Sequence, residues 1–246
     1  MNEVINVLEN HRSIRSYLEK DIPKDIILEI LTSAQDAPNS INGQQTSVIV
    51  IRDKDTKRKL AELAGGQPWI EKAPVFLIFV MDFYKTEVAV KKAGKVQIIE
   101  ESAEGLLAGA VDAGILLGTT VAAAESLGLG TVCIGGIRNS PEEIIKLLNL
   151  PKKTFPLVGL ALGYPADNSR KKPRLPLDTF IHEEKYNPEK IVEEIDGYDK
   201  LMDKYLIEIG REQEKNWSDF VSQYYSKVYF PKVYPILKEQ GFKMDK

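Results

Sequence analysis

Three side chains that could donate hydrogen bonds to an anion alternate near the start of the chain. His11, Ser13 and Arg15 occupy every second position of the run from His11 to Arg15. Alternate side chains of an extended segment point to the same side, and imidazole, hydroxyl and guanidinium groups all donate to phosphate or carboxylate oxygens. On this segment alone, a solvated basic turn after a short helix is the simpler interpretation.

A second basic run lies far away in the sequence. Arg170, Lys171, Lys172 and Arg174 place four positive charges in five residues, with Pro173 between the last two. A run of charge is usually a solvated surface. Because proline restricts the backbone, Lys172 and Arg174 would direct two cations to the same side. The two basic runs together therefore indicate a phosphate site.

Neutral polar groups form the rest of the candidate site. The loop at 37–45 contains amides and hydroxyls without one full charge, and Gln67 follows two glycines. Gly135 and Gly136 come directly after a predicted strand at 131–134, where bare backbone could lie against a ligand. An ordinary turn cluster at 37–45 and a helix end before Gln67 are the simpler alternatives. As a set, these groups suit a polar, uncharged heterocycle.

Most familiar catalytic motifs are excluded. Cys133 is the single cysteine and lies in an apolar run, so we expect an inert, buried thiol. The two histidines, His11 and His182, are too few for a histidine-rich metal site. The sequence has no GxxxxGK[ST] loop and no GxSxG elbow. A site without an obvious acid, base or nucleophile is typical of proteins in which a bound cofactor carries the chemistry.

Composition limits the classes of partner. The 246 residues carry 33 basic and 36 acidic side chains, for a formal charge of −3. This balance argues against a broad nucleic-acid surface, and the single cysteine suits a reducing compartment. The first residues lack the pattern of a secretory signal. We therefore expect a cytoplasmic protein that binds neither nucleic acid nor membrane.

A central helix is predicted from 105 to 124, apolar on nearly every face, so it should be enclosed almost all round. Asp112 is its only charge. A membrane span is the less favoured alternative, because the flanking charges are acidic where lysine or arginine would be expected. Glycines at four-residue spacing would let a second helix, from this chain or from a twin subunit, approach closely: Gly105 with Gly109, and Gly114 with Gly118.

Hydrophobic periodicity predicts the other elements. We expect helices at 4–8, 23–36, 55–64 and 141–150, and strands at 48–52, 75–81, 131–134 and 155–163. The segment at 82–95 is predicted to be a mobile or insertion-like surface segment. From 188 onward the pattern is helical and charged, and we expect an arm or cap without a core of its own.

Several motifs resemble those of the FMN-dependent nitroreductase family, in its NAD(P)H-flavin oxidoreductase and oxygen-insensitive major nitroreductase branch. They are HRSIR at 11–15, GGQ at 65–67, ESLGLG at 125–130 with IGGIRN at 134–139, and GYPADN at 163–168 through KPRLP at 172–176. The resemblance covers almost the whole chain. It implies an α+β fold with a mainly antiparallel central sheet wrapped by helices.

The resemblance also implies a domain organisation and an assembly. Residues 1–246 would form a single nitroreductase-like domain with a helical C-terminal arm or cap at about 188–246. Two chains would form an obligate homodimer with two FMN sites at its interface.

Site residues follow from the resemblance by position. His11, Ser13, Lys172 and Arg174 would hold the FMN phosphate, with Arg12 in the same segment. Arg15 would lie by the pyrimidine edge of the flavin ring, and Gln67 would hydrogen-bond that ring. Backbone at Ile134, Gly135 and Gly136 would lie near N5, and Asn39 and Ser40 would reach the flavin from the other subunit.

The implied reaction is ping-pong. NADPH or NADH passes hydride to FMN N5 and leaves, and a nitroaromatic, quinone, free flavin or azo compound then takes its place. Ile41 and Asn42 are the expected acceptor contacts, while Arg211 and Lys215 could meet the 2′-phosphate of NADPH. Glu208 and Glu214 would repel that phosphate, so the preferred nicotinamide stays open.

Two other functions fit the same pattern. One is a specialised flavin reaction such as reductive dehalogenation or flavin fragmentation. The other is a non-enzymatic flavin carrier or sensor, in which bound FMN would not be reduced by either nucleotide.

Overall fold

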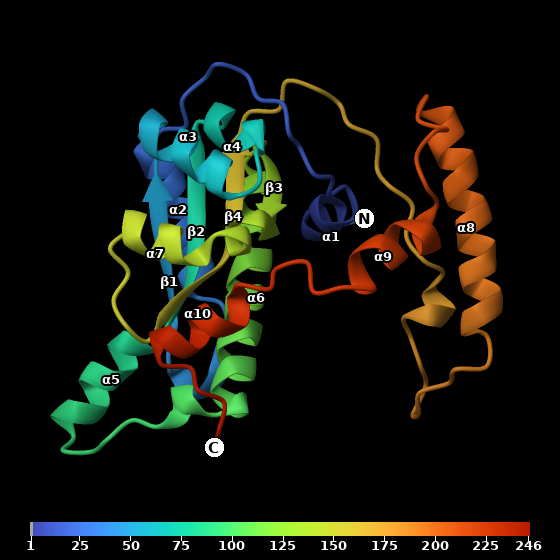
Figure 1. Ribbon diagram of the computed structural model, residues 1–246. Coiled ribbons are helices and arrows are strands. Elements are labelled where there is room, and N and C mark those ends of the chain that lie inside the picture. Colours follow the sequence, from blue (N-terminus) through green and yellow to red (C-terminus); the bar gives the residue numbers. More distant parts are fainter. Residues whose placement is uncertain (1) are drawn as a thin grey trace. The chain divides into compact units, whose positions relative to one another are not determined.

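The computed structural model describes residues 2–246 (Figure 1). The chain forms two compact units: residues up to Ser169 together with Lys232–Lys246, and Arg170–Pro231.

The first unit is built on a four-stranded antiparallel sheet. Its strands are β1 (Thr46–Ile51), β2 (Val75–Asp82), β3 (Gly130–Ile134) and β4 (Thr154–Gly163), in the order β1-β2-β4-β3. β2 pairs with β1 on one side and with β4 on the other. All four predicted strands and the antiparallel sheet are therefore confirmed.

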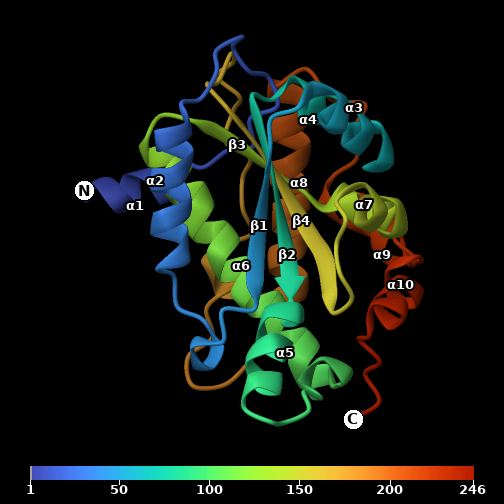
Figure 2. The same ribbon diagram turned by 90° about the vertical axis from the view of Figure 1, so that its left-hand side faces the viewer.

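Helices cover both faces of this sheet (Figure 2). Phe76, Ile78 and Val80 of β2 pack in one apolar cluster, on the face covered by α3 (Lys54–Leu63), α4 (Pro68–Lys72) and α7 (Pro141–Leu147). Val75, Leu77 and Phe79 pack in another, on the face covered by α2 (Lys24–Gln35) and α6 (Ala103–Ser126). Since side chains alternate along a strand, the unbroken apolar run of β2 is buried on both faces.

The central helix α6 is exposed on one side of the chain. Asp112, Ala113 and Ala124 are buried, whereas Leu107 and Val111 are 62% and 58% exposed. The prediction that α6 is enclosed almost all round is therefore wrong for the single chain. By length and composition alone, α6 would also be long and apolar enough to cross a membrane.

The glycines of α6 fall into two pairs. A Cβ on Gly105 would collide with the carbonyl of Ile99, and one on Gly109 would lie 2.5 Å from the sulfur of Met81. These two glycines let the same chain pack closely against α6. A Cβ on Gly114 or Gly118 would meet nothing within 4 Å, so this second pair faces open space.

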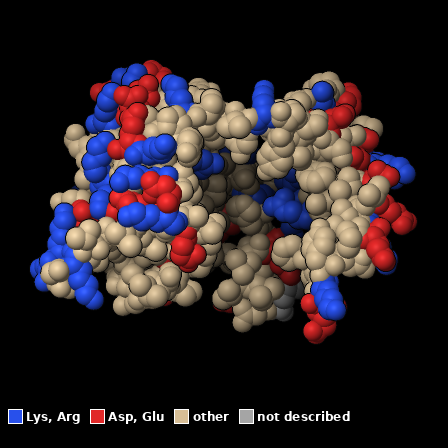
Figure 3. Space-filling view, turned by 60° about the horizontal axis from the view of Figure 1, so that its bottom comes forward, with Lys and Arg blue, Asp and Glu red and all other residues tan. Residues whose placement is uncertain are grey.

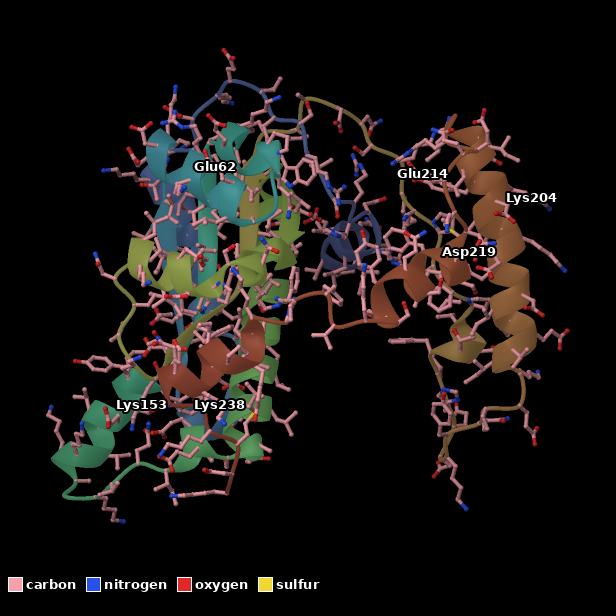
Figure 4. All side chains as sticks on the ribbon, viewed as in Figure 1. Glu62, Lys153, Lys204, Glu214, Asp219 and Lys238 are labelled. Atoms are coloured by element: carbon pink, nitrogen blue, oxygen red, sulfur yellow. The ribbon has the colours of Figure 1, made fainter. Side chains whose placement is uncertain are left out.

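The segment at 82–95, predicted to be a mobile or insertion-like surface segment, contains a helix, α5 (Phe83–Lys92). The Asp82 side chain accepts a hydrogen bond from the backbone N–H of Lys85 and so caps its first turn. Lys153 forms ion pairs with Glu87 of α5 and with the buried Glu100, which tie α5 to the body (Figure 4). The charges that suggested a mobile or insertion-like segment include an i, i+4 pair, Glu87 with Lys91.

The chain ends on the first unit. α10 (Val233–Gln240) contributes Ile236 and Leu237 to a cluster with Met81 and Phe155. The N-terminal helix α1 (Glu3–Glu9) contributes no buried residue. Short 3-10 turns complete the unit: η1 (Ser40–Asn42), η2 (Ile99–Glu101) and η3 (Gly135–Asn139).

The second unit contains η4 (Leu177–Thr179), α8 (Ile191–Glu208) and α9 (Trp217–Tyr225). Tyr198, Met202 and Leu206 of α8 form a small buried cluster. Trp217 packs against it, with its ring 5.9 Å from that of Tyr198. The helical prediction is confirmed, but the expectation that this part of the chain lacks a core of its own is wrong.

Acidic and basic side chains are interspersed over the left-hand lobe in Figure 3. This mixture continues the near balance of 33 basic and 36 acidic residues in the sequence.

Candidate functional site

The first basic segment runs beside the edge strand β3. Ser13 forms a bridge with Thr131, and the N–H of Ile14 donates to the Thr131 carbonyl at 2.8 Å. Ile14 is buried against Gly130, where a Cβ would lie only 2.7 Å from its side chain. Because Ile14 points inward, the extended geometry directs Ser13 and its alternate neighbours outward.

The side chain of His11 contacts that of Glu125, near the C-terminal end of α6. Its Nδ1 lies 2.8 Å from Oε1 of Glu125, and the hydroxyl of Thr131 donates to the same oxygen at 2.7 Å. Thr131 is fully buried. A single carboxylate therefore joins the basic segment, helix α6 and strand β3.

The two arginines of this segment have partners of their own. Arg12 donates to the carbonyl of Asn10 at 3.1 Å and to the side chain of Asn168 at 3.0 Å, while its Nε is buried without a partner. The guanidinium carbon of Arg15 lies 5.5 Å from the ring centroid of Trp69, a cation–π geometry. Both side chains are thus oriented before any ligand binds.

Gln67 and Gly136, distant in sequence, lie against each other. A Cβ on Gly136 would fall 2.3 Å from Nε2 of Gln67 and 2.4 Å from the carbonyl of Ala64. The same Nε2 donates to the Ala64 carbonyl at 2.9 Å. Only glycine fits at position 136, so the backbone after buried Ile134 is bare at Gly135 and Gly136.

The neutral loop is anchored by Asp112, which sequence reasoning did not assign to the site. The N–H of Ser40 donates to both carboxylate oxygens of Asp112 at 3.1 Å, and Nε2 of buried Gln45 donates at 2.6 Å. The signal was available in the sequence, because a lone charge inside an apolar helix requires a partner when it is buried.

The tip of this loop is strained and exposed. Ile41 and Asn42 have φ values of 49° and 55°, which are uncommon for residues with a side chain. Ile41 is 97% exposed, while Asn39 accepts a hydrogen bond from the N–H of Gln44 at 3.1 Å. A β-branched residue held with positive φ on a fixed loop is typical of a functional position.

Behind the loop lies a cavity of about 310 Å³. It is lined by side chains of α2, β1, α6 and the loop, among them Leu31, Gln35, Asn39, Val48, Asp112 and Leu116. The loop is therefore supported at Asp112 and borders open volume elsewhere.

In the second unit, Lys172 and Arg174 flank a fixed proline. The hydroxyl of Tyr198 donates to the Pro173 carbonyl at 2.8 Å, and burial raises the pKa of Tyr198. The Lys172 ammonium lies 6.0 Å from the ring centroid of Phe220. Within residues 2–246, neither Lys172 nor Arg174 forms an ion pair.

Arg211, by contrast, is already paired. It forms an ion pair with Glu214, one of the two acids predicted to repel a 2′-phosphate (Figure 4). The backbone carbonyl of Glu208 accepts a hydrogen bond from Arg170 at 3.5 Å. Within residues 2–246, the Lys215 side chain forms no hydrogen bond, ion pair or ring contact.

Cys133 is exposed on β3, so the prediction of a buried thiol is wrong. Partial burial of the sulfur and the nearby Glu125 carboxylate nevertheless raise its thiol pKa, which keeps the thiol protonated at neutral pH. Within residues 2–246, no group of three or more His, Cys, Asp and Glu side chains is arranged to hold a metal ion.

Comparisons with known proteins agree with this arrangement. The Nitroreductase family matches residues 8–164, and the Nitroreductase family C-terminal domain matches residues 172–245. The chain is 49% identical to FMN reductase [NAD(P)H] of Bacillus subtilis (strain 168) over 100% of both chains. It is 36% identical to oxygen-insensitive NADPH nitroreductase of Salmonella typhimurium, over 98% of this chain and 99% of the relative.

Solved structures show the same fold. B. megaterium NfrA2 has a TM-score of 0.98 at 45% identity, covering 100% of both chains. NADPH:FMN oxidoreductase from Vibrio harveyi, complexed with NAD+, has a TM-score of 0.89 at 32% identity, covering 98% of this chain and 99% of that one. The predicted α+β fold is thereby confirmed, and the chain belongs to the nitroreductase family.

Proposed function

We propose that this chain is an FMN-dependent NAD(P)H oxidoreductase that reduces nitroaromatics, quinones or free flavin. The names of its relatives, FMN reductase and oxygen-insensitive NADPH nitroreductase, support this assignment. The structural observation that carries it is the bare strand end at Gly136 with Gln67 against it, because Gly136 has no room for a side chain.

The residues fit FMN by their chemistry. His11, Ser13, Lys172 and Arg174 are donors suited to a phosphate, and we assign them to the FMN phosphate, with Arg12 orienting their segment. Gln67 would hydrogen-bond the ring, backbone from Ile134 to Gly136 would lie along it, and Asn39 and Ser40 would reach it from a second subunit. The buried, unpartnered nitrogens of Arg12 and Trp69 also suit a polar ligand nearby.

FMN, when bound, supplies the hydride chemistry, and the protein's residues bind and orient. Arg15, fixed over Trp69, would stabilise negative charge at the pyrimidine edge of the ring. We assign Ile41 and Asn42 to the acceptor because they form the exposed tip of the loop anchored at Asp112.

Nicotinamide preference depends on the second unit. Arg211 and Lys215 are the cations assigned to a 2′-phosphate. Because Arg211 is paired with Glu214, Lys215 is left as the main attraction, which would give only weak discrimination between NADPH and NADH.

We also infer that the protein is a cytoplasmic homodimer. The exposed apolar face of α6, with Leu107, Val111 and Ile115, and the open backbone at Gly114 and Gly118 could receive a second copy. Val4, Ile5 and Leu8 of α1 are exposed as well. Sedimentation of the purified protein should give twice the mass of 27.6 kDa, and a monomer would contradict this assignment.

Anaerobic absorbance spectra test the function directly. Purified protein should show oxidised flavin bands that bleach with NADH or NADPH, added in separate cuvettes. Rapid turnover of a quinone or nitroaromatic would then count against a specialised flavin reaction. Flavin bands that neither nucleotide bleaches would favour the carrier, and no flavin after reconstitution with FMN would overturn the proposal.

A further inference from the structure

Glu125 holds His11 in a way that the proposed function does not require by itself. Oε1 of Glu125 lies 2.8 Å from Nδ1 of His11 and accepts from the Thr131 hydroxyl at 2.7 Å. The Glu125 side chain is 13% exposed and that of His11 is 32% exposed. The carboxylate therefore lies on the inner side of the imidazole, where a ligand approaching from solvent meets the ring first.

The hydrogen bonds at Oε1 determine which ring nitrogen carries a proton. An ionised carboxylate can only accept hydrogen bonds. The contact at 2.8 Å therefore requires a proton on Nδ1 of His11, which leaves Nε2 to face away from Glu125. Thr131, whose hydroxyl donates to the same oxygen, is fully buried and bridged to Ser13. Thr131 therefore also holds the Glu125 carboxylate in place.

This tautomer has a consequence for an anion. In a neutral ring protonated on Nδ1, Nε2 carries a lone pair and can only accept a hydrogen bond. A phosphate oxygen is also an acceptor, so the two would repel each other. Phosphate can be bound at Nε2 only if that nitrogen gains a second proton.

We propose that Glu125 is a positioning residue that keeps one His11 proton on Nδ1, so that phosphate can be bound at Nε2 only by the ring that is protonated on both nitrogens. The identification of that phosphate with the phosphate of FMN rests on the proposed function. The geometry at Glu125 does not.

The neighbouring charged and titratable groups either are neutral or have partners other than His11 and Glu125. Cys133, on β3, has a raised thiol pKa and is neutral. Arg12, the next residue along, directs its guanidinium to Asn10 and Asn168. Arg15 lies over Trp69. In the described part of the chain, His11 is the ion-pair partner of Glu125.

NMR of the purified protein labelled with ¹⁵N-histidine tests the tautomer directly. The sequence contains only His11 and His182, so His182→Gln assigns the two imidazoles. We expect the neutral His11 ring at alkaline pH to be protonated on Nδ1. In Glu125→Gln, the amide can accept or donate, so both tautomers should be populated. A wild-type ring protonated on Nε2 would overturn the proposal.

Binding measurements test the coupling. Above pH 7 the FMN phosphate is a dianion, so any remaining pH dependence belongs to the protein. We expect the wild-type FMN dissociation constant to rise by up to about tenfold per pH unit, as expected for one proton, while that of riboflavin stays flat. Glu125→Gln should flatten the FMN curve, because a neutral ring protonated on Nε2 can donate to phosphate.

The test includes a matched control variant and an outcome that would contradict the proposed function without deciding the role of Glu125. Glu104→Gln, an exposed acid at the other end of α6, should keep the wild-type slope. Equal slopes in Glu125→Gln and the wild type would overturn the coupling. Absence of FMN binding at every pH would instead contradict the proposed function, and the NMR result would still decide the role of Glu125.

Discussion

The two basic segments of this protein differ in what their side chains already contact. In the segment at 11–15, His11 meets Glu125, Arg12 meets Asn10 and Asn168, and Arg15 lies over Trp69. In the segment at 170–174, the backbone is fixed at Pro173 by Tyr198, but Lys172 and Arg174 have no carboxylate partner within residues 2–246.

This difference separates two uses of positive charge. The hydrogen bonds that Arg12 donates to Asn10 and Asn168 hold its segment in place, so Arg12 contributes to the fold and directs its neighbours. Lys172 and Arg174 form no ion pair and no side-chain hydrogen bond within residues 2–246, so their donors are available to an anion. Arg12 should therefore matter for geometry and stability, and Lys172 and Arg174 for affinity.

The largest expected effect comes from removing the unpaired cations. Lys172→Ala with Arg174→Ala should weaken FMN binding about a hundredfold or more, as expected when two charge-assisted hydrogen bonds are lost. Thermal unfolding of the flavin-free protein should be unchanged. Lys190→Ala with Lys200→Ala, in the same unit, is the control. Unchanged FMN affinity would remove Lys172 and Arg174 from the site.

The opposite result is expected for Arg12→Ala. Loss of its hydrogen bonds to Asn10 and Asn168 should lower the free energy of unfolding by about 1 kcal/mol, measured by urea denaturation. Arg58→Ala, which removes an exposed ion pair with Asp55, should have a smaller effect. If Arg12→Ala weakens FMN binding as strongly as the double variant does, the comparison between the segments fails.

A smaller effect is expected from Tyr198→Phe. This change removes the hydrogen bond to the Pro173 carbonyl but keeps the ring that packs against Trp217. FMN affinity should fall by a factor of about 2 to 10, measured by fluorescence titration, because the cations beside Pro173 are held less firmly. Riboflavin affinity, and FMN affinity in Tyr186→Phe, should not change.

The smallest expected effect concerns Glu101, whose carboxylate is paired with Lys243 and Lys246. Hydrogen bonds from Lys243 and Lys246 lower the pKa of Glu101 to about 2. A depressed carboxyl pKa contributes stability above the ordinary value of 4.5, which is lost as pH falls toward 2. Hydrogen exchange near Asp245, whose N–H donates to the Glu101 carbonyl, should accelerate in that window in the wild type. Glu101→Gln should lack this dependence, and an equal dependence in both would contradict the pairing.

Much of the fold could be predicted because local patterns agree with burial. The unbroken apolar run of β2 predicts a buried strand, and the periodic apolar face of α2 predicts a helix packed on the sheet. The glycines that follow α6 predict the end of that helix. α5 was missed because its pattern is made of charges: Asp82 caps its start and Glu87 pairs with Lys91. The exposure of Cys133 was missed because an apolar run on an edge strand is not buried on both faces.

The candidate site could be predicted in its residue types but not in its supports. Motifs identified His11, Gln67 and Gly136, and the fold brings the last two together. Glu125 lies 114 positions from His11, and Asp112 lies 72 positions from Ser40. No spacing rule connects residues that far apart, so these supports required the tertiary structure.

Asp112 connects the loop at 37–45 to a turn of α6 that is also exposed on the surface. Its carboxylate is buried and accepts a hydrogen bond from the Ser40 N–H, while its neighbour Val111 is exposed on the same turn of α6. A subunit seated on Val111 would thus rest on the same turn that fixes the loop at 37–45, which we propose contacts the acceptor. The range of acceptors would then be a property of the assembled pair, and mixed dimers carrying Asp112→Ala in one chain would show whose loop serves whose flavin.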